Sequence, residues 1–342
     1  MKISPKIIRK VLEMQRDIYL VFGDKILFVI DDPLIITLIN NILTEKCGYY
    51  CEIAIIPTME TPGQDYPLSE SHLENKTVGW LITQASASHS LATKKMLDRK
   101  MFVISNPGIT PDWPAMLNPK NRSACQNNAN AILSAIGGNI GGTICVSHED
   151  GTDLTLNLPN KNWLRETGER NVFTNGTYGE LCTAPYFANG CYVLNPISGD
   201  FFTNPLNRVR KRTTLVIKDN HVVKITGGKQ AEFLKRMLEK TGDKRAFCLG
   251  EFAFGLNPGL KPQDKIYRSV IAEKIAGGIH IAIGTNSVCL SENCPEIGKF
   301  KYGRYNAGVH IDAIKFGANV VFCPENSNRQ ILILDKSHLL VP

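Results

Sequence analysis

The chain has 342 residues, of which 43% are hydrophobic and 21% are charged, a composition typical of folded globular proteins and not of disordered or fibrous ones. Its net charge of +7 comes from 39 Lys and Arg against 32 Asp and Glu, and the charges are spread along the chain. This distribution argues against a dedicated nucleic-acid binder but is compatible with an anionic substrate. A chain of this length is expected to form about two domains.

The N-terminus and the cysteines predict a cytoplasmic protein. Residues 1–18 carry five basic residues and lack the uninterrupted apolar run of a secretory signal. No segment reaches the roughly 18–20 apolar residues of a membrane-spanning helix, so no membrane association is expected. The ten cysteines are scattered without a CxxC pair, which indicates reduced and mostly buried thiols.

The first part of the chain predicts an α/β domain with a mainly parallel sheet over residues 1–122, because helix-like and strand-like segments alternate. Ser4 and Pro5 can start a helix that runs to about residue 18. The apolar run 26–30 indicates a strand, and Asp32 can cap the helix that follows. The other predicted elements of this half are strands at 50–56, 78–82 and 101–104 and a helix at 91–98.

The pattern changes after residue 122, and residues 123–342 predict an α+β domain. Here strands are separated by turn signals instead of helices, and Asp150-Gly151 and Asp219-Asn220 are typical hairpin turns. The remaining predicted elements are helices at 122–136 and at 229–240, the latter closed by Gly242, and strands around Phe247, Ile281 and Val320.

Two histidines and an aspartate form a candidate metal site in this second domain. His310 and Asp312 are two residues apart on an extended segment, so their side chains project to the same face. His280 lies in an apolar strand pattern that ends at Gly284. Two histidines and one carboxylate are a minimal site for iron(II), zinc or manganese. The spacing alone leaves open whether these residues bind a metal or form a structural hydrogen-bonded set.

Two isolated carboxylates also require an explanation. Glu180 and Glu251 are each surrounded by apolar or small residues in the sequence. Burying an unpaired charge is very costly, so each carboxylate is expected to meet a metal, another cation or solvent.

Four motifs resemble the thermophilic metallo-aminopeptidase family of the aminopeptidase T type. They are Gly-Glu-Leu-Cys-Thr-Ala-Pro at 179–185, Gly-Glu-Phe-Ala-Phe-Gly-Leu-Asn-Pro-Gly at 250–259, Glu-Lys-Ile-Ala-Gly-Gly-Ile-His-Ile-Ala-Ile-Gly at 273–284 and Val-His-Ile-Asp at 309–312. The resemblance covers about residues 170–325. It implies a homodimer with one or two divalent ions, zinc, cobalt or manganese, bound by Glu180, Glu251, His280, His310 and Asp312. In that family's pattern Glu251 is best placed to bridge two metals, and Glu180 either binds a metal or holds the attacking water.

The first half is similar to a neighbouring branch of this superfamily, the ring-opening dihydroxypyridine dioxygenases. The similarity lies in Thr83-Gln-Ala-Ser-Ala-Ser-His89 and in Asn106-Pro-Gly-Ile-Thr-Pro-Asp112. It implies a single iron(II) on His280, His310 and Asp312, with His89 as a candidate catalytic base for a substrate hydroxyl. The alternative for His89 is an exposed histidine that caps a helix in a Ser-rich turn.

One departure weakens the peptidase interpretation. The aminopeptidases have a catalytic tyrosine shortly after the first metal-binding histidine, where this chain has Ser287, Val288 and Cys289. Tyr302 or Tyr305 could substitute for it from the following loop, although no spacing argument supports either. The segment between 286 and 303 is unlike both branches, so we expect it to set substrate choice.

Three hypotheses follow for the function. We favour a metal-dependent hydrolase that activates water to cleave a peptide or amide bond in a small molecule or short peptide, because the five-residue ligand set is complete. The alternative is a mononuclear iron(II) ring-cleaving dioxygenase, in which Glu180 and Glu251 orient the histidines. The third hypothesis is a metal that only stabilises the fold, while the N-terminal domain binds a small molecule or partner. It ranks last because structural zinc sites use more thiolate ligands.

Overall fold

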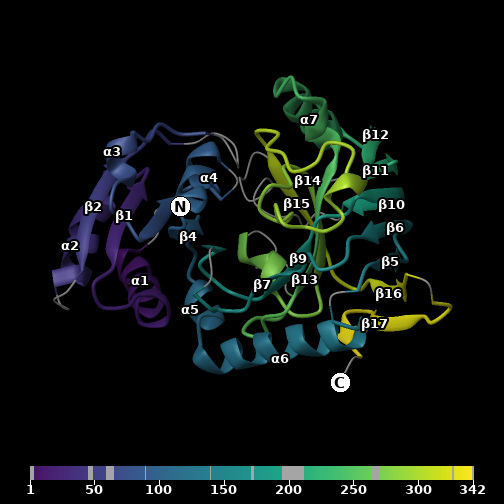
Figure 1. Ribbon diagram of the computed structural model, residues 1–342, viewed down its shortest axis with the longest axis horizontal. Helices are drawn as coiled ribbons and strands as arrows, with labels where there is room; N and C mark the ends of the chain where they lie inside the picture. The colour runs from purple at the N-terminus through teal and green to yellow at the C-terminus, as the bar shows by residue number, and fades with distance from the viewer. Residues whose placement is uncertain are drawn as a thin grey trace.

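The computed structural model describes residues 4–44, 49–58, 65–88, 90–138, 140–170, 173–194, 212–262, 270–325 and 327–340. Three sheets form successive layers of the molecule, as Figure 1 shows: the N-terminal sheet A, then sheet C, then sheet B. Helix α6 (Pro119–Ala135) runs along one end of these layers. The predicted order of an α/β part followed by an α+β part is confirmed.

Sheet A is parallel, as the alternation in the sequence predicts, with strand order β2-β1-β3-β4-β8. Its strands are β1 (Lys25–Ile30), β2 (Tyr50–Ile55), β3 (Val78–Thr83), β4 (Phe102–Pro107) and β8 (Phe173–Thr174). The helices of this part are α1 (Pro5–Tyr19), η1 (Pro33–Ile35), α2 (Ile36–Thr44), α3 (Glu70–Leu73), α4 (Leu91–Asp98) and α5 (Trp113–Met116). Alternate residues of β1 belong to different clusters, since Phe28 packs in the cluster with Leu12 of α1 and Val29 in the cluster with Met96 of α4. Helices therefore cover both faces of the sheet.

Capping residues explain where the predicted helices begin. Asp32 accepts a hydrogen bond from the Leu34 backbone N at 3.0 Å, and it caps the short helix η1, which leads into α2. Helix α6 begins at Pro119, three residues before the predicted start, because Asn118 caps it through the Lys120 backbone N at 3.0 Å. A domain boundary at residue 122 would fall inside α6, and the predicted division stays a prediction.

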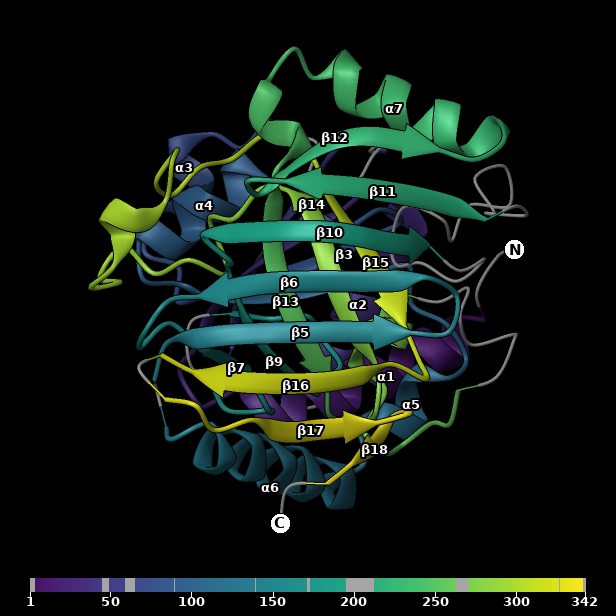
Figure 2. The same ribbon diagram turned by 90° about the vertical axis from the view of Figure 1, so that its right-hand side faces the viewer.

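Sheet B is antiparallel, with strand order β12-β11-β10-β6-β5-β16-β17-β18 (Figure 2). Its strands are β5 (Gly142–His148), β6 (Thr152–Leu158), β10 (Phe187–Leu194), β11 (Thr213–Lys218), β12 (His221–Thr226), β16 (Asn319–Pro324), β17 (Ile331–Asp335) and β18 (His338–Leu339). The two predicted hairpins join β5 to β6 and β11 to β12. Asp219 and Asn220 both have positive φ, at 49° and 62°, as a tight hairpin turn of this kind requires. Helix α7 (Lys229–Lys240) follows at the predicted position.

Sheet C, the middle layer, is also antiparallel, with strand order β15-β14-β13-β9-β7. Its strands are β7 (Leu164–Glu166), β9 (Glu180–Thr183), β13 (Leu249–Gly255), β14 (Ile279–Gly284) and β15 (His310–Lys315). Short helical turns connect them: η4 (Lys244–Phe247), η6 (Val270–Lys274) and η7 (Ile297–Lys299). The strand expected around Phe247 begins only at Leu249, because Asp243 caps η4 through the Arg245 backbone N at 2.8 Å.

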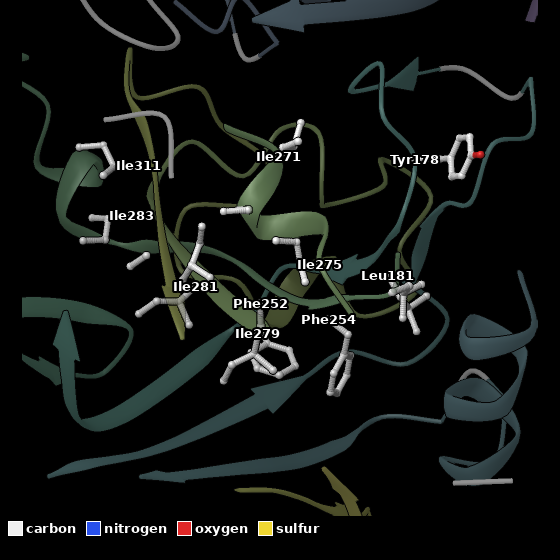
Figure 3. Packing of buried hydrophobic residues seen from close by; sticks show 14 of the residues in the cluster. Tyr178, Leu181, Phe252, Phe254, Ile271, Ile275, Ile279, Ile281, Ile283 and Ile311 are labelled. Carbon is white, nitrogen blue, oxygen red and sulfur yellow. The ribbon is translucent and has the colours of Figure 1, made fainter. Parts of the chain in front are cut away.

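The two faces of sheet C differ in character. Figure 3 shows Phe252, Phe254 and Ile279 pointing to the same side of the sheet, within the large apolar cluster that continues into sheet B. The Tyr192 hydroxyl of β10 fixes this contact by donating a hydrogen bond to the Ala313 carbonyl of β15 at 2.8 Å. The opposite face of sheet C looks toward sheet A and carries polar residues.

None of the helices among the described residues has the length and apolar character needed to span a bilayer. The cytoplasmic location and the homodimer stay predictions.

Candidate metal centre

The strand register places the predicted metal ligands on one face of sheet C. His280 lies opposite Ala253, and Asp312 lies opposite Ala282. Residues paired across an antiparallel ladder share a face, and so do residues two apart on a strand. All five predicted residues therefore lie on the polar face, and the small alanine side chains between them leave space. These five are Glu180, Glu251, His280, His310 and Asp312.

Glu251 stands at the centre of this group. Its Oε2 lies 3.0 Å from His310 Nε2, and its Oε1 lies 3.3 Å from His280 Nε2. His310 Nε2 is also 3.2 Å from Asp312 Oδ1, and His280 Nε2 is 3.5 Å from Glu180 Oε1. All five side chains are buried. The structure thus brings together every residue that the sequence pattern singled out in this domain.

The close approach of imidazoles and carboxylates shifts their proton affinities. Burial alone would raise the pKa of Glu251, but hydrogen bonds from His280 and His310 hold it well below its usual value. Burial would lower the pKa of His310, but the charge and hydrogen bond of Asp312 raise it well above its usual value. The same contact lowers the pKa of Asp312 against the effect of burial. The cluster therefore favours positive charge next to Glu251 and Asp312.

The donor set fits a divalent cation. His310 Nδ1 lies 2.9 Å from the Thr285 carbonyl oxygen, which can only accept, so Nδ1 carries the hydrogen and Nε2 is left for a metal. Four groups of three described residues have ligand atoms within 4.8 Å of one another, and two of these groups combine Glu251 with a histidine. One is completed by His310 and Asp312, the other by Glu180 and His280. Imidazoles and carboxylates suit several first-row metals, so the set does not select one.

A buried lysine that the sequence analysis missed lies at the edge of this group. Lys274 of η6 is only 1% exposed, and its Nζ contacts Glu180 Oε2. The same Nζ lies 3.2 Å from Glu166 Oε2 and 3.4 Å from Glu273 Oε1. One sequence signal could have revealed Glu273 and Lys274, because they open the motif that contains His280. Glu166 is revealed only by the structure, in which it pairs directly with Glu180 in the β7–β9 register.

Cys289 occupies the stretch where the resemblance to aminopeptidases predicts a tyrosine. Its Sγ donates a hydrogen bond to Glu251 Oε2 at 2.8 Å. Burial raises the pKa of this thiol to about 11, so it holds its proton at neutral pH. Asn162 fixes the position of Cys289, because its Nδ2 donates to the Cys289 carbonyl at 2.7 Å and to Thr183 Oγ1 at 3.0 Å.

Neither tyrosine proposed as a substitute reaches the site. Tyr305 places its ring 5.3 Å from the Arg245 guanidinium, and Tyr302 lines a separate surface pocket with Lys218 and His221. The pocket at the metal ligands has no tyrosine among its described lining residues.

That pocket lies between sheet A and sheet C and is narrow, with a cavity volume of about 20 Å³. Pro107, Trp113 and Phe173 supply apolar and aromatic walls from the side of sheet A. Two lining residues, Trp113 and Thr177, are fully buried, and their Nε1 and Oγ1 atoms have no hydrogen-bond partner in the described part of the chain. His89 lies outside the described residues, so its proposed role as base stays a prediction.

Comparisons with known proteins concern the fold and part of the sequence. The family model for NicX, 2,5-dihydroxypyridine 5,6-dioxygenase, matches residues 116–268, a range that includes Glu180 and Glu251 but ends before His280. The fold is similar to that of 2,5-dihydroxypyridine dioxygenase from Pseudomonas putida KT2440, with a TM-score of 0.70, 15% identity, and coverage of 100% of this chain and 99% of that one. It is also similar to wild-type AmpT from Thermus thermophilus, with a TM-score of 0.64, 13% identity, and coverage of 97% and 99%. Among curated proteins, none matches the sequence.

At these identities the two solved structures establish the fold, and the fold agrees with the four sequence motifs and the family match. Both relatives are enzymes. The chain therefore shares its fold with these two proteins, and its residues 116–268 match the dihydroxypyridine dioxygenase family model.

Proposed function

We propose that this protein is an iron(II)-dependent dioxygenase that opens the ring of a small hydroxylated aromatic compound. The observation that carries the proposal is the wall of the pocket opposite the metal ligands. There Pro107, Trp113 and Phe173 line the pocket, and two lining residues, Trp113 and Thr177, have a buried Nε1 and Oγ1 without a partner among the described residues.

A planar ring with oxygen substituents is complementary to this wall. Leaving a buried polar group without a partner costs about 1–3 kcal/mol, so a ligand that pairs with Trp113 Nε1 or Thr177 Oγ1 recovers that energy. The indole N–H only donates, and the threonine hydroxyl can donate or accept. Hydroxyl or carbonyl oxygens on an aromatic ring provide suitable partners, while the ring itself packs against Phe173 and Pro107.

Asp312 belongs to one group of close ligand atoms with His310 and to another with His280, which supports these three residues as ligands of the proposed metal. His280, His310 and Asp312 would hold the ion, and iron(II) bound in this way supplies redox chemistry with dioxygen. Glu251 lies within 3.3 Å of Nε2 of both histidines and accepts a hydrogen bond from Cys289, so it is held next to the atoms that would bind the ion. The match to the dioxygenase family over residues 116–268 further supports this candidate.

A hydrolase resembling aminopeptidase T is the second candidate. It is favoured by the position of Glu251, which belongs to the group with Glu180 and His280 and to the group with His310 and Asp312, and could bridge two cations that activate water. The complete five-residue set led the sequence analysis to prefer this function. It is the second candidate because the described lining residues include no tyrosine, whereas Trp113 and Phe173 line the pocket.

Parallel assays on iron-loaded and zinc-loaded protein test both candidates. We expect the anaerobically prepared iron(II) protein to consume oxygen when 2,5-dihydroxypyridine or a related dihydroxylated ring is added, with loss of the ring's ultraviolet absorption. The zinc protein should do neither. Hydrolysis of aminoacyl p-nitroanilides by the zinc, cobalt or manganese form, without oxygen uptake by the iron form, would favour the second candidate. Full folding without any bound metal and without turnover would contradict both.

A further inference from the structure

A second pocket opens on the surface at the turn between β11 and β12. It has a volume of about 490 Å³ and is lined by the β11–β12 hairpin, by η4 and by the loop that follows η7. Three of its lining residues are lysines, one from each of these parts of the chain: Lys218, Lys244 and Lys301. None of the three lines the pocket at the metal ligands, so the two pockets have separate walls.

This second pocket carries an excess of positive charge. Lys218, Lys244 and Lys301 are exposed, and within the described ranges none of their ammonium groups forms an ion pair. The described lining residues thus include three ammonium groups against one carboxylate, that of Asp219. Burial, together with the charge of Lys301, lowers the pKa of the lining residue His221, so this imidazole adds no charge at neutral pH. Like charges around one hollow favour an anion there.

The walls are held together by contacts that do not use the three ammonium groups. Asn220 Nδ2 donates a hydrogen bond to the Leu249 carbonyl at 3.1 Å, which fixes the hairpin turn against β13. In η4, Arg245 Nη2 donates to Asp243 Oδ2 at 2.7 Å, and the guanidinium lies 5.3 Å from the centre of the Tyr305 ring. The carboxylate beside Lys244 in the sequence is therefore already occupied by Arg245. The lysine side chains can contact a ligand on a scaffold that is formed without it, which lowers the entropic cost of binding.

Apolar surface lies next to these charges. Tyr302 is a half-buried lining residue, and Lys301 Nζ lies 5.3 Å from the centre of its ring. Val223, another lining residue, is 56% exposed. Ammonium groups bind phosphate oxygens well, but inorganic phosphate would leave this apolar surface uncovered. Pockets for small organic ligands measure about 300–1,000 Å³, and the volume of this pocket lies in that range.

We propose that this pocket binds a small organic phosphate, with its phosphate group on Lys218, Lys244 and Lys301 and a planar group against Tyr302. The proposal goes beyond the metal centre and does not depend on the reaction proposed for it. A doubly charged phosphate replaces repulsion among the ammonium groups with attraction. An aromatic ring on the ligand can stack on the tyrosine ring, which inorganic phosphate cannot do.

Lys224 of β12 provides the matched control. It is an exposed lysine on the same hairpin as Lys218, but it is not among the described lining residues of the pocket. Lys224→Met therefore removes the same charge from the same part of the surface and leaves the pocket unchanged.

Calorimetric titration of the metal-loaded full chain with adenosine monophosphate, inorganic phosphate and adenosine tests the proposal. We expect adenosine monophosphate to bind, inorganic phosphate to bind more weakly and adenosine not to bind. Lys244→Met and Lys301→Met should each weaken binding of adenosine monophosphate about 10-fold, as the loss of a hydrogen bond to a charged group predicts, and Lys224→Met should bind like the parent. Tyr302→Ala should weaken binding of adenosine monophosphate about 3–10-fold and leave the affinity for inorganic phosphate unchanged.

Phosphate can also bind a metal ion, and the lysine variants separate the two sites. Equal affinity for adenosine monophosphate in the parent, Lys244→Met and Lys301→Met would place the anion elsewhere and overturn the proposal. Failure of the parent to bind adenosine monophosphate would also overturn it. Inorganic phosphate binding as tightly as adenosine monophosphate, with no effect of Tyr302→Ala, would contradict an organic ligand. Circular dichroism should show the same fold in all variants, because the replaced lysines are exposed.

Discussion

Cys289 Sγ donates a hydrogen bond to Glu251 Oε2, and the two atoms are 2.8 Å apart. The same Oε2 lies 3.0 Å from His310 Nε2. A protonated thiol thus fixes the carboxylate that touches both histidines, in the stretch of chain where the related peptidases are expected to have a tyrosine. Groups that orient metal ligands in this way contribute strongly to metal affinity.

Replacing Cys289 should weaken metal binding. Cys289→Ala removes the donor, and we expect metal affinity to fall about 10–100-fold, with partial recovery in Cys289→Ser, which retains a donor. Competition with a chromophoric chelator measures the affinity. Cys294→Ala is the control, because Cys294 is buried in the same loop but does not line the pocket. Equal losses in Cys289→Ala and Cys294→Ala would show that the loop's packing, and not the hydrogen bond, is responsible.

Removing one imidazole should abolish activity while leaving the fold intact. His310 provides Nε2 to the metal group, and its Nδ1 forms a hydrogen bond with the Thr285 carbonyl. We expect His310→Ala to bind metal at least about 100-fold more weakly and to lose turnover, with an unchanged circular dichroism spectrum. Turnover retained by this variant would refute the metal centre as the site of reaction.

Removing the unpartnered Thr177 hydroxyl should weaken substrate binding without lowering the stability of the fold. Thr177→Val removes a buried hydroxyl that has no partner among the described residues, so the free energy of unfolding should stay the same or rise by about 1 kcal/mol. If the hydroxyl binds substrate, the same variant should raise KM about 5–10-fold, in line with the loss of one hydrogen bond of about 1 kcal/mol. Urea titration and steady-state kinetics provide the two measurements. A lower stability with unchanged KM would assign Thr177 a structural role.

The pair of Asp150 and Lys315 predicts a pH-dependent contribution to stability. Burial alone would raise the pKa of Asp150, but the hydrogen bond and charge of Lys315 lower it to about 2, from 3.8 in the absence of such contacts. Because the folded-state pKa is the lower one, the stabilisation is present above about pH 4 and is lost as the pH falls toward about 2. Allowing for solvent screening, it amounts to about 1 kcal/mol. The difference in unfolding free energy between the parent and Asp150→Asn should narrow over that range, and a constant difference would contradict the pairing.

Much of the fold could be predicted because the relevant signals are local. Periodicity and capping residues correctly located α4 and α7, and the turn pairs at 150–151 and 219–220 correctly located two hairpins. The convergence of His310 with Asp312 also follows from spacing on one strand, since residues two apart share a face. These features depend on residues close together in the sequence.

The parts of the site that could not be predicted depend on contacts distant in sequence. Lys274 meets Glu166 across 108 positions, and only the register of β7 against β9 shows that Glu166 lies beside Glu180. The role of Cys289 depends on Asn162, which holds its carbonyl from 127 positions away. Hydrophobic periodicity carries no information about such pairs, because every residue involved occupies a buried position.

Strand β8 has a further consequence for how the molecule unfolds. The chain leaves sheet C after Glu166, adds Phe173 and Thr174 to sheet A, and returns to sheet C at Glu180. Arg170 lies in the same segment. Its Nη1 donates to Asp24 Oδ2 at 2.6 Å and its Nη2 donates to Asp24 Oδ1 at 2.7 Å. The segment between β7 and β9 of sheet C thus contributes strand β8 to sheet A. If either sheet unfolds, the other is expected to lose part of its strand pairing. Heating should therefore produce one calorimetric peak, with both halves of the molecule lost together.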